Sequence, residues 1–123
     1  MNPRQHAVAL LEFTRKISND ILNGITDDKL THQPSPTDNH ALWGMGHLAA
    51  TDAWIASTLN IPGVNVPEAV TKAYSGGAKP TQKGNPPASE VRKAFNESRV
   101  AVLRWLREAP ESALTTDLKE KTG

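Results

Sequence analysis

The sequence has no cysteine in its 123 residues, which excludes disulfide bonds and thiolate metal ligands. It also has no apolar run approaching the ~20 residues that a membrane-spanning helix needs. Glu12 and Arg15 interrupt the amino-terminal segment, unlike the continuous apolar core of a signal peptide. These absences favour a cytoplasmic protein with no membrane partner. At this length, we expect residues 1–123 to form a single domain.

Neither sign of charge dominates, because the formal net charge is +1. Residues 1–60 carry four basic and six acidic groups, whereas residues 61–123 carry ten basic and seven acidic groups. The arginines of the second half alternate with glutamates, which is typical of a solvated helix face. We therefore expect no nucleic-acid partner.

Apolar residues recur at helical spacing near the amino terminus, and no segment of the sequence shows the two-residue period of a strand. The first predicted helix has Asn2 as its N-cap and Pro3 in its first turn, and it stops at Gly24. His6 falls on its apolar face, as a histidine at the end of the core. The apolar stripe of this helix comprises Leu10, Phe13, Ile17 and Ile21.

A second helix is predicted from a cap at Asp38 or Asn39 to about Leu59. Its glycines favour close approach of a neighbouring helix, because glycine has no side chain to hold two backbones apart. The predicted apolar stripe comprises Gly44, Leu48, Thr51, Ile55 and Leu59. Beside that stripe lie Trp43, His47, Ala50 and Trp54.

Residues 60–88 contain five prolines and four glycines, too many for a long regular element, although Pro67–Tyr74 can form a short helix. A linker of this length is unusual in a compact domain. It can cross the ~30 Å length of a helix, so that the next helix runs parallel to the previous one. That third helix is predicted over Ser89–Ala109 and ends before Pro110. The fold class is all-α.

Histidines are the candidate metal ligands, because zinc and nickel sites in helical bundles usually draw about three side chains from facing helices. His40 and His47 lie ~10.5 Å apart along a helix, too far to share one ion with bonds of ~2.1 Å. Asp52 lies about 140° around the helix from His47 and is no natural partner. The residues alone leave His47 either a metal ligand or a buried core histidine. The four candidates are His6, His32, His40 and His47.

The segment Leu42–Trp54, with Gly-His-Leu at its centre, resembles the second-helix signature of the DinB/YfiT-like family of metal-dependent enzymes. The order around it is also similar: an acidic turn at Thr26–Leu30, a proline-containing loop, a long crossover and a third amphipathic helix. The resemblance covers nearly the whole chain. It implies a DinB-like four-helix bundle of up-down-down-up arrangement.

The resemblance also implies a divalent metal, zinc or nickel, held by a histidine of the second helix and an HxxxH pair on the fourth. Carried over to this sequence, only His47 matches a ligand. The sequence ends where the fourth helix is expected, so we expect this bundle to lack that helix and its HxxxH pair. The family chemistry is metal-dependent transfer or hydrolysis on a small molecule, and includes thiol S-transferases. No catalytic residue can be named.

Two other interpretations compete with a metal-dependent enzyme. One is a non-catalytic helical module that self-associates, with His47 as a buried core histidine. The other is a bundle that binds a small ligand without metal. Trp43 and Trp54 either line a pocket beside His47 or belong to the core. The apolar stripes predict a homodimer, because open apolar surfaces of several hundred Å² are uncommon on stable monomers.

Overall fold

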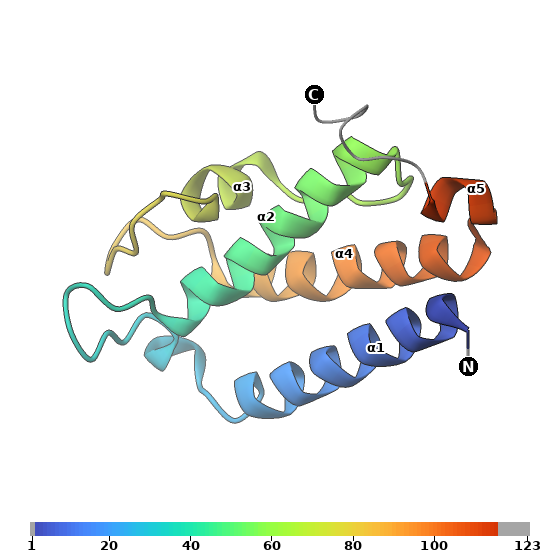
Figure 1. Cartoon of the computed structure of the whole chain (residues 1–123). Coiled ribbons are helices and arrows are strands. Elements are labelled where there is room, and N and C mark those ends of the chain that lie inside the picture. Colours follow the sequence, from blue (N-terminus) through green and yellow to red (C-terminus); the bar gives the residue numbers. More distant parts are fainter. Residues whose placement is uncertain (1, 116–123) are drawn as a thin grey trace.

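The computed structural model of the chain describes residues 2–115, and these form helices joined by turns and loops, without strands. No helix in this part of the chain is long and apolar enough to cross a membrane. Figure 1 shows α2 and α4 running in the same direction and α1 running the opposite way along α4. The elements are α1 (Pro3–Leu22), the 3-10 turn η1 (Asp27–Lys29), α2 (Ala41–Leu59), α3 (Glu68–Tyr74), α4 (Ala88–Glu108) and α5 (Glu111–Leu114).

The contact between α2 and α4 forms the core. Met45 and Phe95, in the first halves of these two helices, belong to one buried cluster. Ala56 and Val102, in the second halves, belong to another. The two helices therefore pack start to start and end to end, which confirms the predicted parallel arrangement across the linker of residues 60–88. The short helix predicted within that linker is α3.

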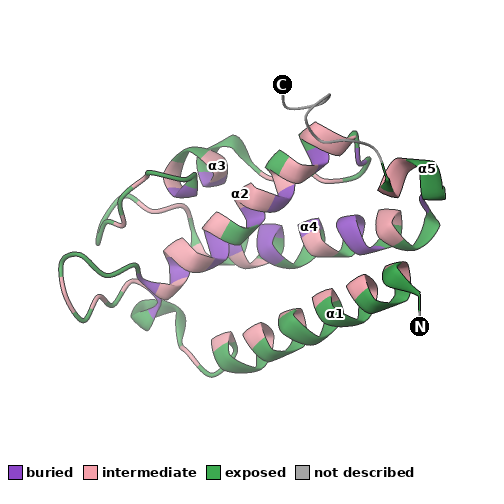
Figure 2. Ribbon diagram, in the orientation of Figure 1, coloured by how far each residue is buried: buried purple, intermediate pink, exposed green. Residues whose placement is uncertain are grey.

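Helix α1 packs against α4 but buries none of its residues. Figure 2 shows α1 without a buried position, while α2 and α4 bury the faces they turn toward each other. The stripe predicted to lie in the core is exposed, with Leu10, Phe13, Ile17 and Ile21 between 42% and 62% accessible. His6 is exposed as well. That prediction was wrong because α1 turns a different face to α4, and the stripe has no partner among residues 2–115.

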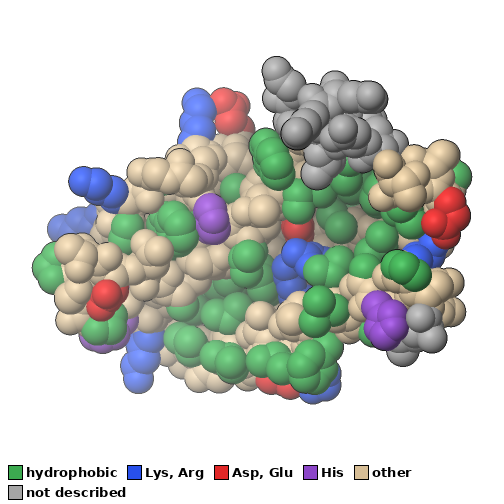
Figure 3. All heavy atoms as spheres, viewed as in Figure 1, with side chains coloured by type: hydrophobic (Ala, Val, Ile, Leu, Met, Phe, Trp, Pro, Cys, Tyr) green, Lys and Arg blue, Asp and Glu red, His purple; other side chains and the backbone are tan. Residues whose placement is uncertain are grey.

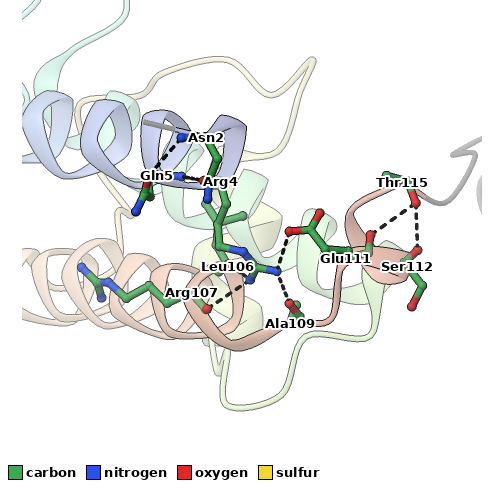
Figure 4. A network of polar contacts seen from close by, with 9 residues as sticks. All are labelled: Asn2, Arg4, Gln5, Leu106, Arg107, Ala109, Glu111, Ser112 and Thr115. Carbon is green, nitrogen blue, oxygen red and sulfur yellow. Dashed lines mark hydrogen bonds and ion pairs between the residues drawn. The ribbon is translucent and has the colours of Figure 1, made fainter.

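An arginine attaches the start of α1 to the end of α4. The Arg4 guanidinium donates to the carbonyl oxygens of Leu106, at 2.7 Å, and Arg107, at 3.1 Å, and also to the carbonyl of Ala109. The Arg4 guanidinium also forms an ion pair with Glu111 at 3.5 Å (Figure 4). The last carbonyls of a helix lack partners within the helix and carry partial negative charge. Arg4 therefore caps α4 from outside.

At the opposite end of the α1–α4 pair, another arginine donates to backbone carbonyls. Arg92, near the start of α4, donates to the carbonyl oxygens of Ile25 at 3.1 Å and Leu22 at 3.4 Å, and pairs with Asp27 at 3.1 Å. Because α1 and α4 run antiparallel, the arginine in the early turns of each helix reaches the last carbonyls of the other. Polar contacts at both ends thus attach α1, where the prediction from hydrophobicity expected apolar packing.

The buried face of α2 differs from the predicted stripe. Leu48, placed in the core by the prediction, is 41% exposed. The N-cap is His40 and not Asp38 or Asn39. Apolar residues occupy most of the circumference of α2, so periodicity alone does not select a face. The buried residues are Leu42, Met45, Gly46, Ala49, Asp52 and Ala56.

Replacing Arg4 with alanine should lower the free energy of unfolding by about 1–2 kcal/mol, because the last carbonyls of α4 lose a charged donor. Denaturant unfolding measures the change, and hydrogen exchange should show faster exchange in α1. The matched control is Arg104→Ala on the exposed side of α4, which should change stability little. Equal stability of the two variants would contradict the capping role.

Candidate functional site around His47

The imidazole of His47 is held in a defined orientation. Its Nδ1 lies 2.8 Å from the carbonyl oxygen of Tyr74. A carbonyl only accepts hydrogen bonds, so Nδ1 carries a proton and, in the neutral ring, Nε2 keeps a lone pair. The ring stacks on Trp43, with centroids 4.6 Å apart and planes 13° from parallel. Within residues 2–115, Nε2 has no hydrogen-bond partner, so this atom is available to a ligand.

Gly46 makes this orientation possible. A Cβ atom at position 46 would lie 1.9 Å from Cδ2 of Tyr74, so only glycine lets the Tyr74 ring pack here. The ring is 1% exposed, and its hydroxyl donates to Oδ1 of Asn85 at 2.9 Å. Burial raises the pKa of Tyr74 to about 12. Gly46 therefore admits α3 against α2, and this packing brings the Tyr74 carbonyl to His47.

The two tryptophans beside His47 have different surroundings. Trp43 is half-buried and stacks on the imidazole. Trp54 is 60% exposed, so it is not a core residue. It lines a recess of about 210 Å³ together with His47 and Thr51. Of the two readings that the sequence left open for Trp54, the structure supports the pocket.

His47 also borders a larger groove of about 430 Å³ between α1 and α2. Apart from its chain neighbours and the backbone of its own helix, no atom of the described residues lies within 4 Å of a Cβ added at Gly44, which leaves this part of the groove open. Figure 3 shows a hollow along the boundary of α1 and α2 with hydrophobic side chains on both sides. The lining residues are mostly apolar: Ser18, Ile21, Leu22, Ala41, Gly44, Met45, His47, Leu48 and Phe95.

Asp52 faces α4 and not His47. Its carboxylate is fully buried and accepts from the Ser98 hydroxyl at 2.9 Å. Arg99 completes the pair at 3.0 Å. Removing either partner of a buried carboxylate–arginine pair strongly destabilises the folded protein, because the other charge stays buried without a partner. Asp52 therefore fixes the register of α2 on α4. It points away from His47, as its angle around the helix predicted, and it is not a candidate metal ligand.

His40 has a structural role. Its Nδ1 accepts from the backbone N–H of Trp43 at 2.9 Å, and its Nε2 donates to the carbonyl of Thr81 at 2.8 Å. Both ring nitrogens are thus used to cap α2 and to hold the crossover. His32 is exposed, like His6. In the part of the chain that the structure describes, no group of three or more histidine, aspartate or glutamate side chains could hold a metal ion.

The parallel pair α2 and α4, the long crossover and the oriented histidine define an all-α bundle protein with one imidazole at the edge of an apolar groove. The sequence profile of the DinB superfamily matches residues 10–121. The chain belongs to the DinB superfamily. No curated protein and no solved structure matches it significantly. For the metal that this family implies, residues 2–115 present one oriented donor, His47, and not a complete ligand set.

Gly46→Ala should lower stability by about 1–3 kcal/mol, because its Cβ displaces the Tyr74 ring from a filled site. Gly44→Ala is the matched control. It lies on the same helix with open space around its Cβ, so it should raise stability by up to ~1 kcal/mol through helix propensity. Denaturant unfolding tests both. Equal effects at the two positions would contradict the Tyr74 packing.

Tyr74 should make stability fall at high pH. Its pKa of about 12 in the fold exceeds the ordinary 10.0, so the folded protein holds the phenolic proton more tightly. This contribution is complete below pH 10 and is lost as pH rises from 10 to 12. Because the chain has one tyrosine, ultraviolet absorbance of tyrosinate follows this group alone. Tyr74→Phe should flatten the alkaline loss of stability; an unchanged profile would contradict the assignment.

Proposed function

We propose that this chain is a divalent-metal-binding protein in which Nε2 of His47 is a ligand to zinc or nickel. The supporting observation is the bond from Nδ1 of His47 to the Tyr74 carbonyl. Metal-binding histidines generally donate their second ring nitrogen to a carbonyl or carboxylate, which fixes the tautomer and aims the lone pair. Membership of the DinB superfamily supports the same role. The reaction class we propose is transfer or hydrolysis on a small molecule.

Further ligands come from outside residues 2–115 in this proposal, from a second copy or from a longer polypeptide. A metal bound there would act as a Lewis acid that lowers the pKa of a bound water or thiol. The chain itself contributes the orientation of the imidazole, through Tyr74 and Trp43. It also contributes an apolar groove beside the imidazole, which would hold the body of a small substrate.

We propose a homodimer as the working form, in the cytoplasm. The support is the exposed stripe Leu10, Phe13, Ile17 and Ile21 on α1. Covering apolar surface is worth roughly 25 cal/mol per Å² before the costs of association, so a second copy gains by packing here. Ile21 also borders the groove beside His47. A second copy packed on this stripe would therefore also cover the groove beside His47.

A non-catalytic module that self-associates is the second candidate function. The exposed α1 stripe favours it, as does the lack of a three-ligand group among the described residues. His47 is half-buried and borders two hollows, so in this version it would be a partly exposed polar residue and not a core histidine.

Metal titration separates the two candidates. With zinc or nickel, His47→Ala should remove the binding that the unaltered chain shows, while the exposed His32→Ala should leave it unchanged. We expect weak binding by a monomer, since about three ligands make a tight site. Sedimentation of the same samples reports whether binding accompanies a dimer. Binding that survives His47→Ala would contradict the metal proposal.

An engineered second ligand tests whether Nε2 of His47 is accessible. Thr51 lies one helical turn after His47 and lines the same recess. Thr51→His should create a pair with i,i+4 spacing and raise zinc affinity well above that of the unaltered chain. The double variant His47→Ala with Thr51→His is the control, and it should lose the gain. No gain in Thr51→His would mean that Nε2 is blocked.

A further inference from the structure

Arg15 of α1 lies against Phe95 of α4, one of the residues that line the groove bordered by His47. Its guanidinium carbon is 3.5 Å from the centroid of the Phe95 ring, and one of its nitrogens donates to the Phe95 carbonyl. Phe95 is fully buried and lines the groove. Near the centre of Figure 3, basic side-chain atoms lie beside acidic ones in a hollow that hydrophobic side chains surround.

The positive charge of Arg15 has no dedicated counter-ion. The neighbouring carboxylate, Asp52, is already engaged by Arg99 and Ser98. No carboxylate of residues 2–115 lies within ion-pairing distance of Arg15. Burial and then repulsion from Arg99 lower the pKa of Arg15 to about 10, and attraction to Asp52 offsets this only in part. Asp52 therefore pairs with Arg99, and it attracts the Arg15 guanidinium only from beyond ion-pairing distance.

The groove itself is suited to hydrocarbon, because the residues that line it are mostly apolar. Ile21 and Leu22 of α1 face Met45 and Leu48 of α2 across it, and Gly44 leaves space. Its volume of about 430 Å³ lies within the range of small-molecule sites. A neutral apolar ligand would cover the groove and leave the Arg15 charge without a partner, which is costly once water is excluded. A ligand with one anionic end removes that cost.

We propose that the groove between α1 and α2 binds a small amphiphilic carboxylate, with its carboxylate on Arg15 and its hydrocarbon part against the apolar walls. The planar guanidinium presents N–H groups in a fork that matches a carboxylate. The inference rests on the proposed function only in naming the substrate class of the groove beside His47. The binding itself requires no metal.

The test uses decanoate as the probe, with the full chain in the presence of a chelator and below the concentration at which decanoate forms micelles. Calorimetry measures affinity, and the Nε–Hε cross-peak of Arg15 in an NMR spectrum reports contact. We expect decanoate to bind, decanol to bind about tenfold more weakly or worse, and the Arg15 cross-peak to shift with decanoate alone.

Variants assign the effect to the charge. Arg15→Gln should weaken decanoate binding about tenfold or more, Arg15→Lys should restore part of it, and Arg104→Gln on the exposed side of α4 should do nothing. If Arg15→Gln does not fold, the comparison of decanoate with decanol and the Arg15→Lys variant still show whether the carboxylate binds at Arg15. Equal binding of decanoate and decanol, or no binding of decanoate, would overturn the proposal.

The two proposals can fail separately. His47→Ala should keep the preference for decanoate over decanol, since the metal is absent in this assay. If the chain binds decanoate but binds no metal through His47, only the metal-site proposal is contradicted. If the chain binds metal through His47 but does not bind decanoate, only the carboxylate-site proposal is contradicted.

Discussion

The ring of Tyr74 occupies the volume that any side chain at position 46 would take, and much of the site depends on this contact. It lets α3 lie on α2, and the Tyr74 carbonyl then orients the next residue of α2, His47. The Tyr74 hydroxyl extends the contact to Asn85 in the crossover, whose amide donates to the Thr81 carbonyl that His40 also uses. The absence of a Cβ atom at Gly46 therefore allows Tyr74 to connect the linker of residues 60–88 to the His47 imidazole.

Helix α1 illustrates a different way of attaching a helix. Arg4 and Arg92 cap the last carbonyls at the two ends of the antiparallel pair α1 and α4, and Arg15 lies on the Phe95 ring between them. Three arginines therefore supply much of the attachment of a helix that buries no residue completely. The apolar stripe of α1 stays free as a result, and so does the groove beside α2. The surfaces available for binding follow from the polar attachment of this helix.

Local patterns predicted the elements well, but not their faces. Asn2 with Gln5, Pro67 and Pro110 mark helix ends that sequence chemistry can identify, and the length of the linker predicted the parallel pair. The Gly-His resemblance singled out His47. Its partner Tyr74 lies 27 residues away, and a backbone carbonyl leaves no sequence signal. The buried ion pair of Asp52 with Arg99 was not predicted, because the two residues lie 47 positions apart in the sequence.

The protonation pattern of the His47 ring shows whether the Tyr74 carbonyl orients this imidazole. Long-range proton–nitrogen NMR distinguishes a nitrogen that carries hydrogen from one with a free lone pair. We predict hydrogen on Nδ1 and a lone pair on Nε2 in the neutral ring, with loss of this pattern in Gly46→Ala as the Tyr74 carbonyl moves away. Hydrogen on Nε2, or a mixture of both forms as in a free histidine, would contradict the role of the Tyr74 carbonyl.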